Sequence, residues 1–363
     1  MTRVQPQASR PTQIHMVDLF AGPGGLDVAA HWLGLDVSGI EWDANACDTR
    51  AAAGLRTTSD DVRAYGPADF PESTVLAGGP PCQTYTVAGF GAGRRALDQV
   101  LRFVKDMAAG EDVRARLARL DDERTGLVVE PLRWALEAVK AGRPYDAIIL
   151  EQVPAVLPVW HAVGEALEGV GYKVDCEVLH AEEFGVPQTR RRAILIARFE
   201  QEAKLPKPTH RRYRKGVSRA AGDSQLLPWK TMGSALKRSD SFVVISNYGT
   251  GGDPKARGRR RSDEPAATVT GKISRNRLVT PDGAELDRFS LGDAGRLQTF
   301  PADYPWTGND VAQQIGNAIP PRLAAHVLAA ALGLELDEKS LDAAVEGLWK
   351  VTKDSTPLVT GED

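Results

Sequence analysis

Cysteine is scarce in this 363-residue sequence, and long hydrophobic runs are missing. The three cysteines, Cys47, Cys82 and Cys176, are odd in number and form no Cys-x-x-Cys pair, which argues against a disulfide framework and a structural zinc site. No apolar run approaches the ~20 residues that span a membrane. Residues 1–13 also lack the apolar stretch of a signal peptide. We therefore expect a reduced, cytoplasmic protein.

A surplus of positive charge is also missing, since 45 Lys and Arg residues face 48 Asp and Glu residues. A polyanion could therefore bind only through local basic patches. Residues 204–219 hold seven Lys or Arg and no acid, and residues 254–277 hold eight against Asp263 and Glu264. Because helical periodicity is weak there, these segments indicate a small, irregular, β-leaning domain that contacts phosphates. A solvated surface is the alternative.

Apolar strand-like runs alternate with helical stretches up to about residue 200. Such alternation predicts an α/β fold with a doubly wound, mostly parallel sheet. A charged stretch, residues 94–124, interrupts the pattern, and we expect it to be a solvated helix inserted in a long loop. The expected strands are residues 14–20, 36–40, 74–79, 145–151, 172–179 and 191–198, and the expected helices include residues 26–34, 155–169 and 322–334.

A glycine-rich turn follows the first expected strand, in the segment VDLFAGPGGLD. Gly22, Gly24 and Gly25 would let the backbone pass close to a bound ligand. A nicotinamide-dependent oxidoreductase is one candidate. However, the glycines read G-x-G-G-x-D, because Asp27 stands where the dinucleotide fingerprint has its third glycine.

Acidic and aromatic residues follow this turn at positions suited to a nucleoside. Glu41 closes the second expected strand 23 residues after Asp18, about where an acid grips ribose hydroxyls in such folds. Trp42 could stack on an adenine, and Asp61, 20 residues after Glu41, could accept from the exocyclic amine. A place in the core is the alternative for Trp42.

Cys82 stands between Pro80-Pro81 and a glutamine, directly after a strand-like run. The glycines and prolines of GGPPCQ fix a turn that would lift the thiol to the carboxyl edge of the sheet, where α/β proteins bind ligands. Cysteine acts as a nucleophile only as thiolate, so a reactive one needs positive or amide-rich surroundings. A buried, inert thiol is the alternative.

An acid and two arginines are expected at the same edge. Glu151 ends the strand-like run YDAIILE, while Arg190 and Arg192 stand just ahead of another strand and two residues apart, so both could point to one side. A thiol, a carboxyl group and paired guanidinium groups would then meet around one ring-sized pocket. The alternatives are a helix-capping carboxylate and a surface ion pair.

Six segments together resemble the S-adenosylmethionine-dependent DNA (cytosine-5)-methyltransferases of bacteria and phages. Any one segment could match by chance, but all six follow the order of that family's motifs. The resemblance implies S-adenosylmethionine as cofactor and double-stranded DNA as partner, and the chemistry requires no metal. Chain length, a closed two-lobe plan and the lack of a coiled-coil pattern favour a monomer. The segments are DLFAGPGG (18–25), GGPPCQTYTVAG (78–89), EQV (151–153), QTRRR (188–192), RLQTFPADY (296–304) and QIGNAIPP (314–321).

The resemblance also gives each catalytic candidate a role. Cys82 would add to C6 of cytosine and make C5 electron-rich enough to take a methyl group. Glu151 would donate a proton to N3, and Arg192 would hold O2. Arg190 would stabilise the thiolate or a nearby phosphate. The target base must leave the stack, and a loop with Gly89, Gly91, Gly93, Arg94 and Arg95 would close over it.

The resemblance further implies a division of the chain and two sets of binding residues. The predicted parts are a catalytic domain (1–200), a target-recognition domain (201–287), a hinge (288–314), a return to the catalytic domain (315–345) and a tail (346–363). The implied cofactor residues are Phe20, Gly22, Gly24, Gly25, Glu41, Trp42, Asp61, Leu127 and Asn317. The predicted DNA contacts are Arg94, Arg95, Arg211, Arg212, Arg257, Arg259, Arg260, Arg261 and Lys272.

Several positions depart from the family pattern. Gln152 replaces the usual Asn, and although it could still brace the nucleophile loop, it could also shift Glu151. Thr86 stands where many bacterial members have Ser and where the tRNA-methylating branch also has Thr, so a tRNA cytosine methyltransferase is an alternative. Gly292-Asp293 replaces the usual Arg-Glu. A non-catalytic, DNA-binding relic is the remaining alternative.

Overall fold

The computed structural model describes residues 13–81, 92–120, 122, 124–247 and 257–349. Its largest element is a seven-stranded sheet in the order β3-β2-β1-β4-β5-β8-β6. Only β8 runs against its neighbours β5 and β6, and the other pairings are parallel. The strands are β1 (His15–Leu19), β2 (Asp36–Glu41), β3 (Thr57–Ser59), β4 (Val75–Gly78), β5 (Ala147–Gln152), β6 (Tyr172–His180) and β8 (Arg191–Phe199). The predicted α/β fold is confirmed.

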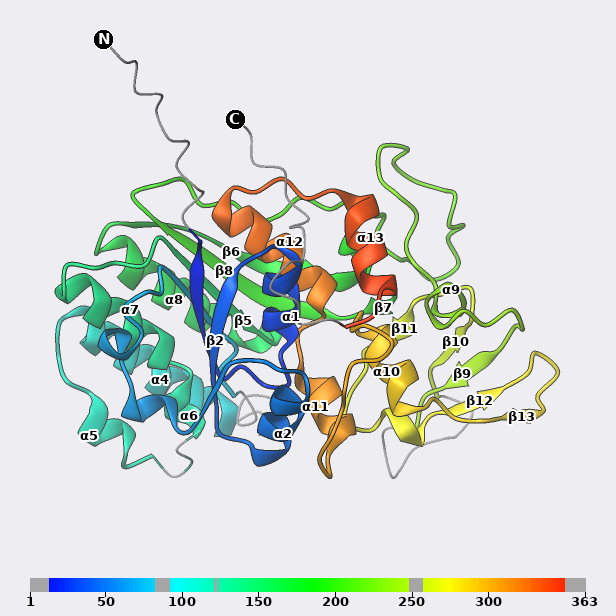
Figure 1. Cartoon of the computed structure of the whole chain (residues 1–363), viewed down its shortest axis with the longest axis horizontal. Coiled ribbons are helices and arrows are strands. Elements are labelled where there is room, and N and C mark those ends of the chain that lie inside the picture. The colour runs from blue at the N-terminus through cyan, green and yellow to red at the C-terminus, as the bar shows by residue number, and fades with distance from the viewer. Residues whose placement is uncertain (1–12, 82–91, 121, 123, 248–256, 350–363) are drawn as a thin grey trace, which may run out of the picture.

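Helices cover both faces of this sheet, which explains why β1, β4 and β5 are almost entirely buried and mostly apolar. One core packs β1 and β5 against α1 and α12, and the other packs the opposite face against α4, α7 and α8. Figure 1 shows α4, α7 and α8 together at the left. We call the sheet and these two layers the large unit. Its helices are α1 (Gly25–Trp32), α2 (Ala44–Ala52), α4 (Ala92–Ala108), α5 (Arg114–Leu117), α6 (Arg124–Leu127), α7 (Glu130–Lys140), α8 (Leu157–Glu168), α12 (Pro321–Leu332) and α13 (Glu338–Glu346).

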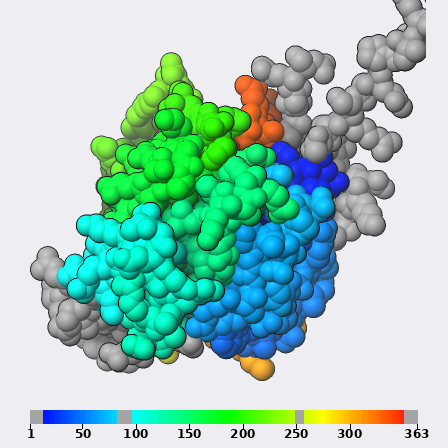
Figure 2. All heavy atoms as spheres, turned by 90° about the vertical axis from the view of Figure 1, so that its left-hand side faces the viewer, coloured from blue at the N-terminus to red at the C-terminus, as the bar shows by residue number. Residues whose placement is uncertain are grey.

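The predicted solvated helix at residues 94–124 is instead part of the core. Val100, Phe103, Val104 and Met107 of α4 are buried in the cluster that contains α8. Their spacing is that of one helical stripe, which the many charged residues on the other faces obscured. In Figure 2 the cyan atoms of this region form the lower left of the left-hand face.

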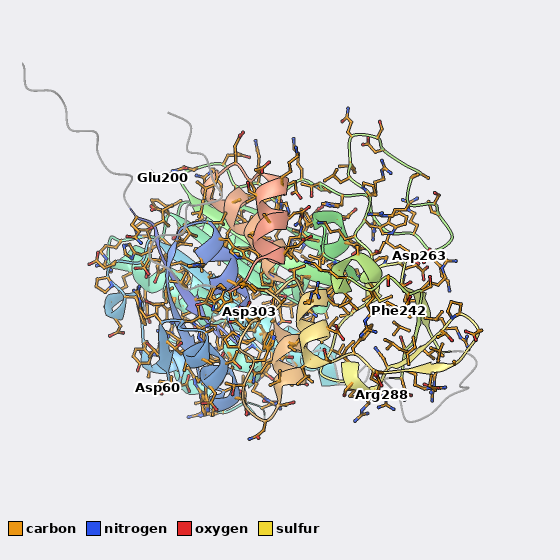
Figure 3. The ribbon with its side chains drawn as sticks, turned by 45° about the vertical axis from the view of Figure 1, so that its right-hand side comes forward. Asp60, Glu200, Phe242, Asp263, Arg288 and Asp303 are labelled. Atoms are coloured by element: carbon orange, nitrogen blue, oxygen red, sulfur yellow. The ribbon has the colours of Figure 1, made fainter. Side chains whose placement is uncertain are left out.

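A smaller antiparallel sheet, in the order β10-β9-β12-β13, has a core of its own. Figure 3 places Phe242, Asp263 and Arg288 of this second unit together, opposite Asp60 of the large unit. Phe289, Ala294, Leu297 and Val311, from the predicted hinge, belong to this core, so we propose that the second unit extends through α11. Its elements are α9 (Met232–Leu236), β9 (Val243–Ile245), β10 (Arg259–Arg261), β12 (Arg277–Val279), β13 (Glu285–Leu286), α10 (Leu291–Leu297) and α11 (Val311–Asn317).

A short parallel pairing joins the two units. β7 (Gln188–Thr189), directly before β8, pairs with β11 (Ala266–Ala267) through Ala266↔Gln188 and Ala267↔Thr189. In the part of the chain that is described, no helix combines the length and the apolar character needed to cross a membrane.

Candidate active site

The carboxyl edge of the large sheet brings together two of the predicted catalytic side chains. β5 ends at this edge, and antiparallel β8 begins there, so Glu151 and Arg192 meet although they lie on different strands. Arg192 Nε forms an ion pair with Glu151 Oε1, and both residues are buried. Arg192 Nη1 also donates to the carbonyl of Arg191, at 2.8 Å. The guanidinium plane is thereby fixed relative to the carboxylate.

The start of the nucleophile segment lies beside Glu151. A Cβ built on Gly79 would lie 3.4 Å from Glu151 Oε2, and Gln152 Nε2 donates to the carbonyl of Pro80. Gln152 Oε1 accepts from the N–H of Val153, at 2.6 Å. The longer side chain at position 152 therefore still braces this segment. Cys82, Thr86, Gly89 and Gly91 lie outside the described residues, as do the side chains of Arg94 and Arg95.

Arg190 does not point with Arg192 toward the carboxyl edge. It is fully buried, and its guanidinium donates to the carbonyls of Val269 (3.1 Å), Gly316 (2.9 Å) and Ala318 (3.0 Å). Burial, and then the charge of Arg192, lower its pKa. Arg190 therefore caps the carboxyl end of α11 and reaches the second unit, and its predicted contact with a thiolate or phosphate stays a prediction.

Two glutamines extend this connection. Gln188 Oε1 accepts from the N–H of Val269 (2.9 Å), while Gln188 Nε2 donates to Gln298 Oε1 (2.6 Å) and to the carbonyl of Leu297 (3.0 Å). Gln298 Nε2 in turn donates to the carbonyl of Ala318, at 3.1 Å. Both side chains are completely buried, so their paired amides specify how β7, the second unit and the α11–α12 junction fit together.

The glycine turn has the conformation that its glycines allow. Gly22 and Gly24 have φ of 54° and 102°, and a Cβ on Gly24 would lie 2.4 Å from Leu55 Cδ1. A Cβ on Gly25 would lie 2.4 Å from the carbonyl oxygen of Ile319. The segment that contains Asn317 therefore packs directly against the turn. Phe20, which starts the turn, has a positive φ of 61°, a strained value for a side chain of this size.

Glu41 ties the end of β2 to this turn. Its Oε2 accepts from the N–H of Gly22 (2.7 Å), and its Oε1 accepts from the N–H groups of Trp42 (2.8 Å) and Asp43 (2.7 Å). Oε1 thus uses both of its lone pairs, whereas Oε2 keeps a further lone pair, which a ribose hydroxyl could use.

The other predicted cofactor residues differ in exposure and in their contacts. The ring of Trp42 is 61% exposed, with the Arg63 guanidinium 6.0 Å from its centroid, so it is not a core residue. Asp61 accepts from Arg63 Nε at 2.8 Å; burial raises the pKa of Asp61, but the bonds and charge of Arg63 outweigh this and lower it. Asn317 is exposed and Leu127 is half-buried.

Arg50, whose side chain supports the glycine turn, was not identified from the sequence. Its guanidinium is completely buried and binds both carboxylate oxygens of Asp27, at 2.8 and 2.7 Å. It also donates to the carbonyls of Ala21 and Gly22. Asp27, which marked the departure from the dinucleotide fingerprint, is therefore the acid that anchors this arginine. Arg50 lies in α2, and no motif in the sequence distinguished it from the other arginines.

Some of the predicted DNA-contacting residues have partners within the protein, and others have none among the described residues. Arg211 donates to the carbonyls of Arg219 (2.9 Å) and Asp223 (2.7 Å), and Arg261 forms an ion pair with Asp263 at 2.9 Å. These two arginines have partners in their own segments, and their predicted contacts with phosphates stay predictions.

Arg212 and Arg260 also have partners within the protein. Arg212 Nη2 lies 2.6 Å from Nε2 of His180, whose pKa is lowered to about 4 by burial and by the charges of Arg212 and Arg191. The Arg260 guanidinium lies 4.4 Å from the centroid of the Tyr213 ring. By contrast, the side chains of Arg257, Arg259 and Lys272 have no hydrogen bond or ion pair to any described residue, and Arg259 and Lys272 are exposed.

Comparisons with known proteins agree with this geometry. A family model described as C-5 cytosine-specific DNA methylase matches residues 14–107 and 116–226. The Type II methyltransferase M1.HphI of Haemophilus parahaemolyticus is 29% identical, over 89% of this chain and 87% of that protein. M.AplI of Arthrospira platensis is 27% identical, over 90% and 88%. The crystal structure of the S. pombe Dnmt2 methyltransferase has the same fold, with a TM-score of 0.59, 15% identity and coverage of 88% and 99%.

The family model matches more than half of the chain, so the resemblance carried by the six motifs is confirmed and the oxidoreductase alternative is wrong. The chain belongs to the C-5 cytosine-specific DNA methylases, enzymes that methylate C5 of cytosine in DNA.

Proposed function

We propose that this DNA methylase transfers the methyl group of S-adenosylmethionine to a cytosine through a transient bond between Cys82 and C6. The observation that carries the proposal is the buried Glu151–Arg192 ion pair, which lies beside Gly79 and Pro80, the residues that lead to Cys82. A pyrimidine ring held by this pair would present C6 to the thiol that follows Pro81.

Attack by the Cys82 thiolate forms the S–C6 bond, breaks the C5–C6 π bond and leaves C5 electron-rich. Negative charge then develops toward N3 and O2 of the ring. For this step Glu151 must hold a proton, which it passes to N3 and takes back when the S–C6 bond breaks. Arg192 donates to O2 through Nη2, since Nε faces Glu151 and Nη1 donates to Arg191. After methyl transfer, a base removes the C5 proton and the S–C6 bond breaks.

The residues around the glycine turn fit the proposed cofactor. Oε2 of Glu41 has a lone pair for a ribose hydroxyl, Trp42 presents an exposed side chain for adenine, and Asp61 presents an acceptor for the adenine amine. The space above Gly22 is open, since a Cβ there would meet nothing within 4 Å. S-adenosylmethionine supplies an electrophilic methyl group on a positively charged sulfur.

We assign Arg190, Gln188 and Gln298 a positioning role in this reaction. They join the α11–α12 junction, next to Asn317, to Val269 of the second unit. These buried bonds would hold the second unit at a fixed angle to the catalytic edge. Arg257, Arg259 and Lys272, whose charges have no partner among the described residues, would contact the DNA backbone there. The target cytosine would leave the stack to reach Glu151, with residues 89–95 closing over it.

The test begins with bisulfite sequencing of host DNA after expression, which reports both activity and target sequence. The purified Cys82→Ser variant should then transfer no labelled methyl group to a duplex with that target, while still binding S-adenosylhomocysteine. Cys47→Ser and Cys176→Ser are the matched controls and should remain active. Full activity of Cys82→Ser would refute the covalent route, and label in tRNA but not in DNA would favour the RNA alternative. Inactivity of the unaltered protein on both polymers would indicate the relic.

A further inference from the structure

Asp18, the fourth residue of β1, is a buried acid that the proposed mechanism does not use. Its side chain is 1% exposed, and neither carboxylate oxygen has a hydrogen-bond partner among the described residues. Buried polar groups nearly always have a hydrogen-bond partner. Two carboxylate oxygens without one, just before a glycine turn, therefore require an explanation.

The strand register places Asp18 between the two acids of the proposed site. Asp18 is level with Gly39 of β2 and Ala77 of β4, and Ala77 is level with Ile149 of β5. Glu41 and Glu151 each follow two residues later on their strands, and residues two apart share a face of a sheet. Asp18, Glu41 and Glu151 therefore all face the side covered by α1 and α12.

Among the described residues, the cation that acts on Asp18 is already bound by another acid. The charged groups around it are Asp27 of α1, Arg50 of α2, Glu41 of β2 and Glu151 of β5. Arg50 is already bound by both oxygens of Asp27. Burial, followed by the charge of Asp27, raises the pKa of Asp18 well above its usual range. The protonated form of Asp18 is therefore favoured more than in a free aspartic acid, and a nearby cation would shift the balance toward the carboxylate.

The proposed cofactor would bring such a cation. A donor held by its ribose at Glu41, with its methyl group directed at a base on Glu151, must cross the end of β1, which lies between β2 and β5. Its charged sulfur would then lie over Asp18. Resting on the proposed function, we propose that Asp18 is the residue that recognises the positive charge of the methyl donor and so distinguishes the donor from the uncharged thioether product.

This role predicts that a proton leaves Asp18 when a positively charged donor binds. The positive charge favours the ionised carboxylate, so affinity for a charged ligand should rise with pH, in proportion to the protons released. A thioether ligand lacks that charge, so its binding should release fewer protons. Loss of the methyl group would also remove the positive charge that favours the ionised form of Asp18.

The experiment is calorimetric titration of the DNA-free protein with two ligands, sinefungin and S-adenosylhomocysteine. Sinefungin carries an ammonium group near the position of the sulfonium, whereas the homocysteine compound has an uncharged sulfur there. Titrations in buffers of different ionisation enthalpy count the protons. Sinefungin should release up to about one proton more than S-adenosylhomocysteine, and Asp18→Asn should abolish that excess. The same variant should weaken sinefungin on the order of tenfold and S-adenosylhomocysteine little.

Glu41→Gln is the matched control, because the ribose is common to both ligands and this variant should weaken both equally. Thermal unfolding of Asp18→Asn checks that the fold is kept. Equal proton release for the two ligands, or an excess that persists in Asp18→Asn, would overturn the inference. If the unaltered protein binds neither ligand, the proposed cofactor site fails as well.

Discussion

In the large unit, Arg50, Arg190 and Arg192 are buried and each guanidinium has partners, whereas in the second unit Arg259 and Lys272 are exposed with no side-chain partner among the described residues. Burial of a cation is unfavourable unless acceptors surround it, so the first group is held in one geometry. An exposed cation stays hydrated, and its side chain keeps its conformational freedom. It can therefore contact phosphates of DNA without one fixed geometry. Cationic side chains therefore hold parts of the protein in place in the large unit, and they are available to attract DNA in the second unit.

The largest effect should come from Arg192. Arg192→Lys removes the planar fork that faces Glu151 and Arg191 together, so we expect kcat to fall about 100-fold, with little change in the Kd for duplex DNA. Single-turnover methyl transfer and fluorescence anisotropy measure the two quantities. The exposed neighbour provides the control, Arg191→Lys, and equal losses in both variants would contradict a specific role for Arg192.

Substitution of Arg190 should change the free energy of unfolding more than the rate of methyl transfer. Arg190→Met leaves the carbonyls of Val269, Gly316 and Ala318 without their buried donor, which should lower the free energy of unfolding by about 3 to 5 kcal/mol. Urea unfolding measures this loss, and Arg190→Lys should restore part of it. A stability unchanged from that of the unaltered protein would show that the carbonyl contacts are unimportant.

The pH dependence of stability should reveal His210. Burial, with the charge of Arg322, lowers the pKa of His210 to about 4, compared with 6.5 for a free side chain. Between these values the unfolded chain binds a proton that the folded chain does not, so the free energy of unfolding should fall as pH drops, by up to about 3 kcal/mol. Urea unfolding of His210→Gln should lack this portion. His161→Gln, on an exposed part of α8, should retain it. A pH-independent difference between His210→Gln and the unaltered protein would count against this assignment.

The smallest effects are expected from the exposed cations. Arg259→Ala should leave stability unchanged and reduce the slope of log Kd against log salt concentration by about 0.9, the contribution of one phosphate contact. Arg261→Ala is the matched control on the same strand, because Asp263 already pairs with Arg261. Equal slopes for the two variants would remove the distinction between paired and free arginines in the second unit.

Strand positions and the Glu151–Arg192 pair could be predicted because they depend on local pattern and on recognisable motifs. The role of Arg190 could not be predicted from the sequence. Alternation along one strand predicted that it faces the same way as Arg192, but β8 begins only at Arg191, and Arg190 lies at the junction with β7. Its acceptors are 79 to 128 residues away, so no short-range pattern signals them.

The prediction for α4 failed for a different reason, because charged residues on its other faces hid its inner apolar stripe. The predicted hinge stays a prediction, although four of its side chains lie in the core of the second unit. The charge runs located basic segments correctly, yet composition could not separate Arg261, which is paired, from Arg259, which has no partner among the described residues.

The central claim is that one particular sulfur bonds to the cytosine ring, and trapping that bond tests it most directly. A duplex carrying 5-fluorocytosine at the methylated position, incubated with the protein and S-adenosylmethionine, should give a single covalent complex. Peptide mass spectrometry should locate the adduct on Cys82. No adduct on a duplex whose normal counterpart is methylated, or an adduct on Cys47 or Cys176, would contradict the account.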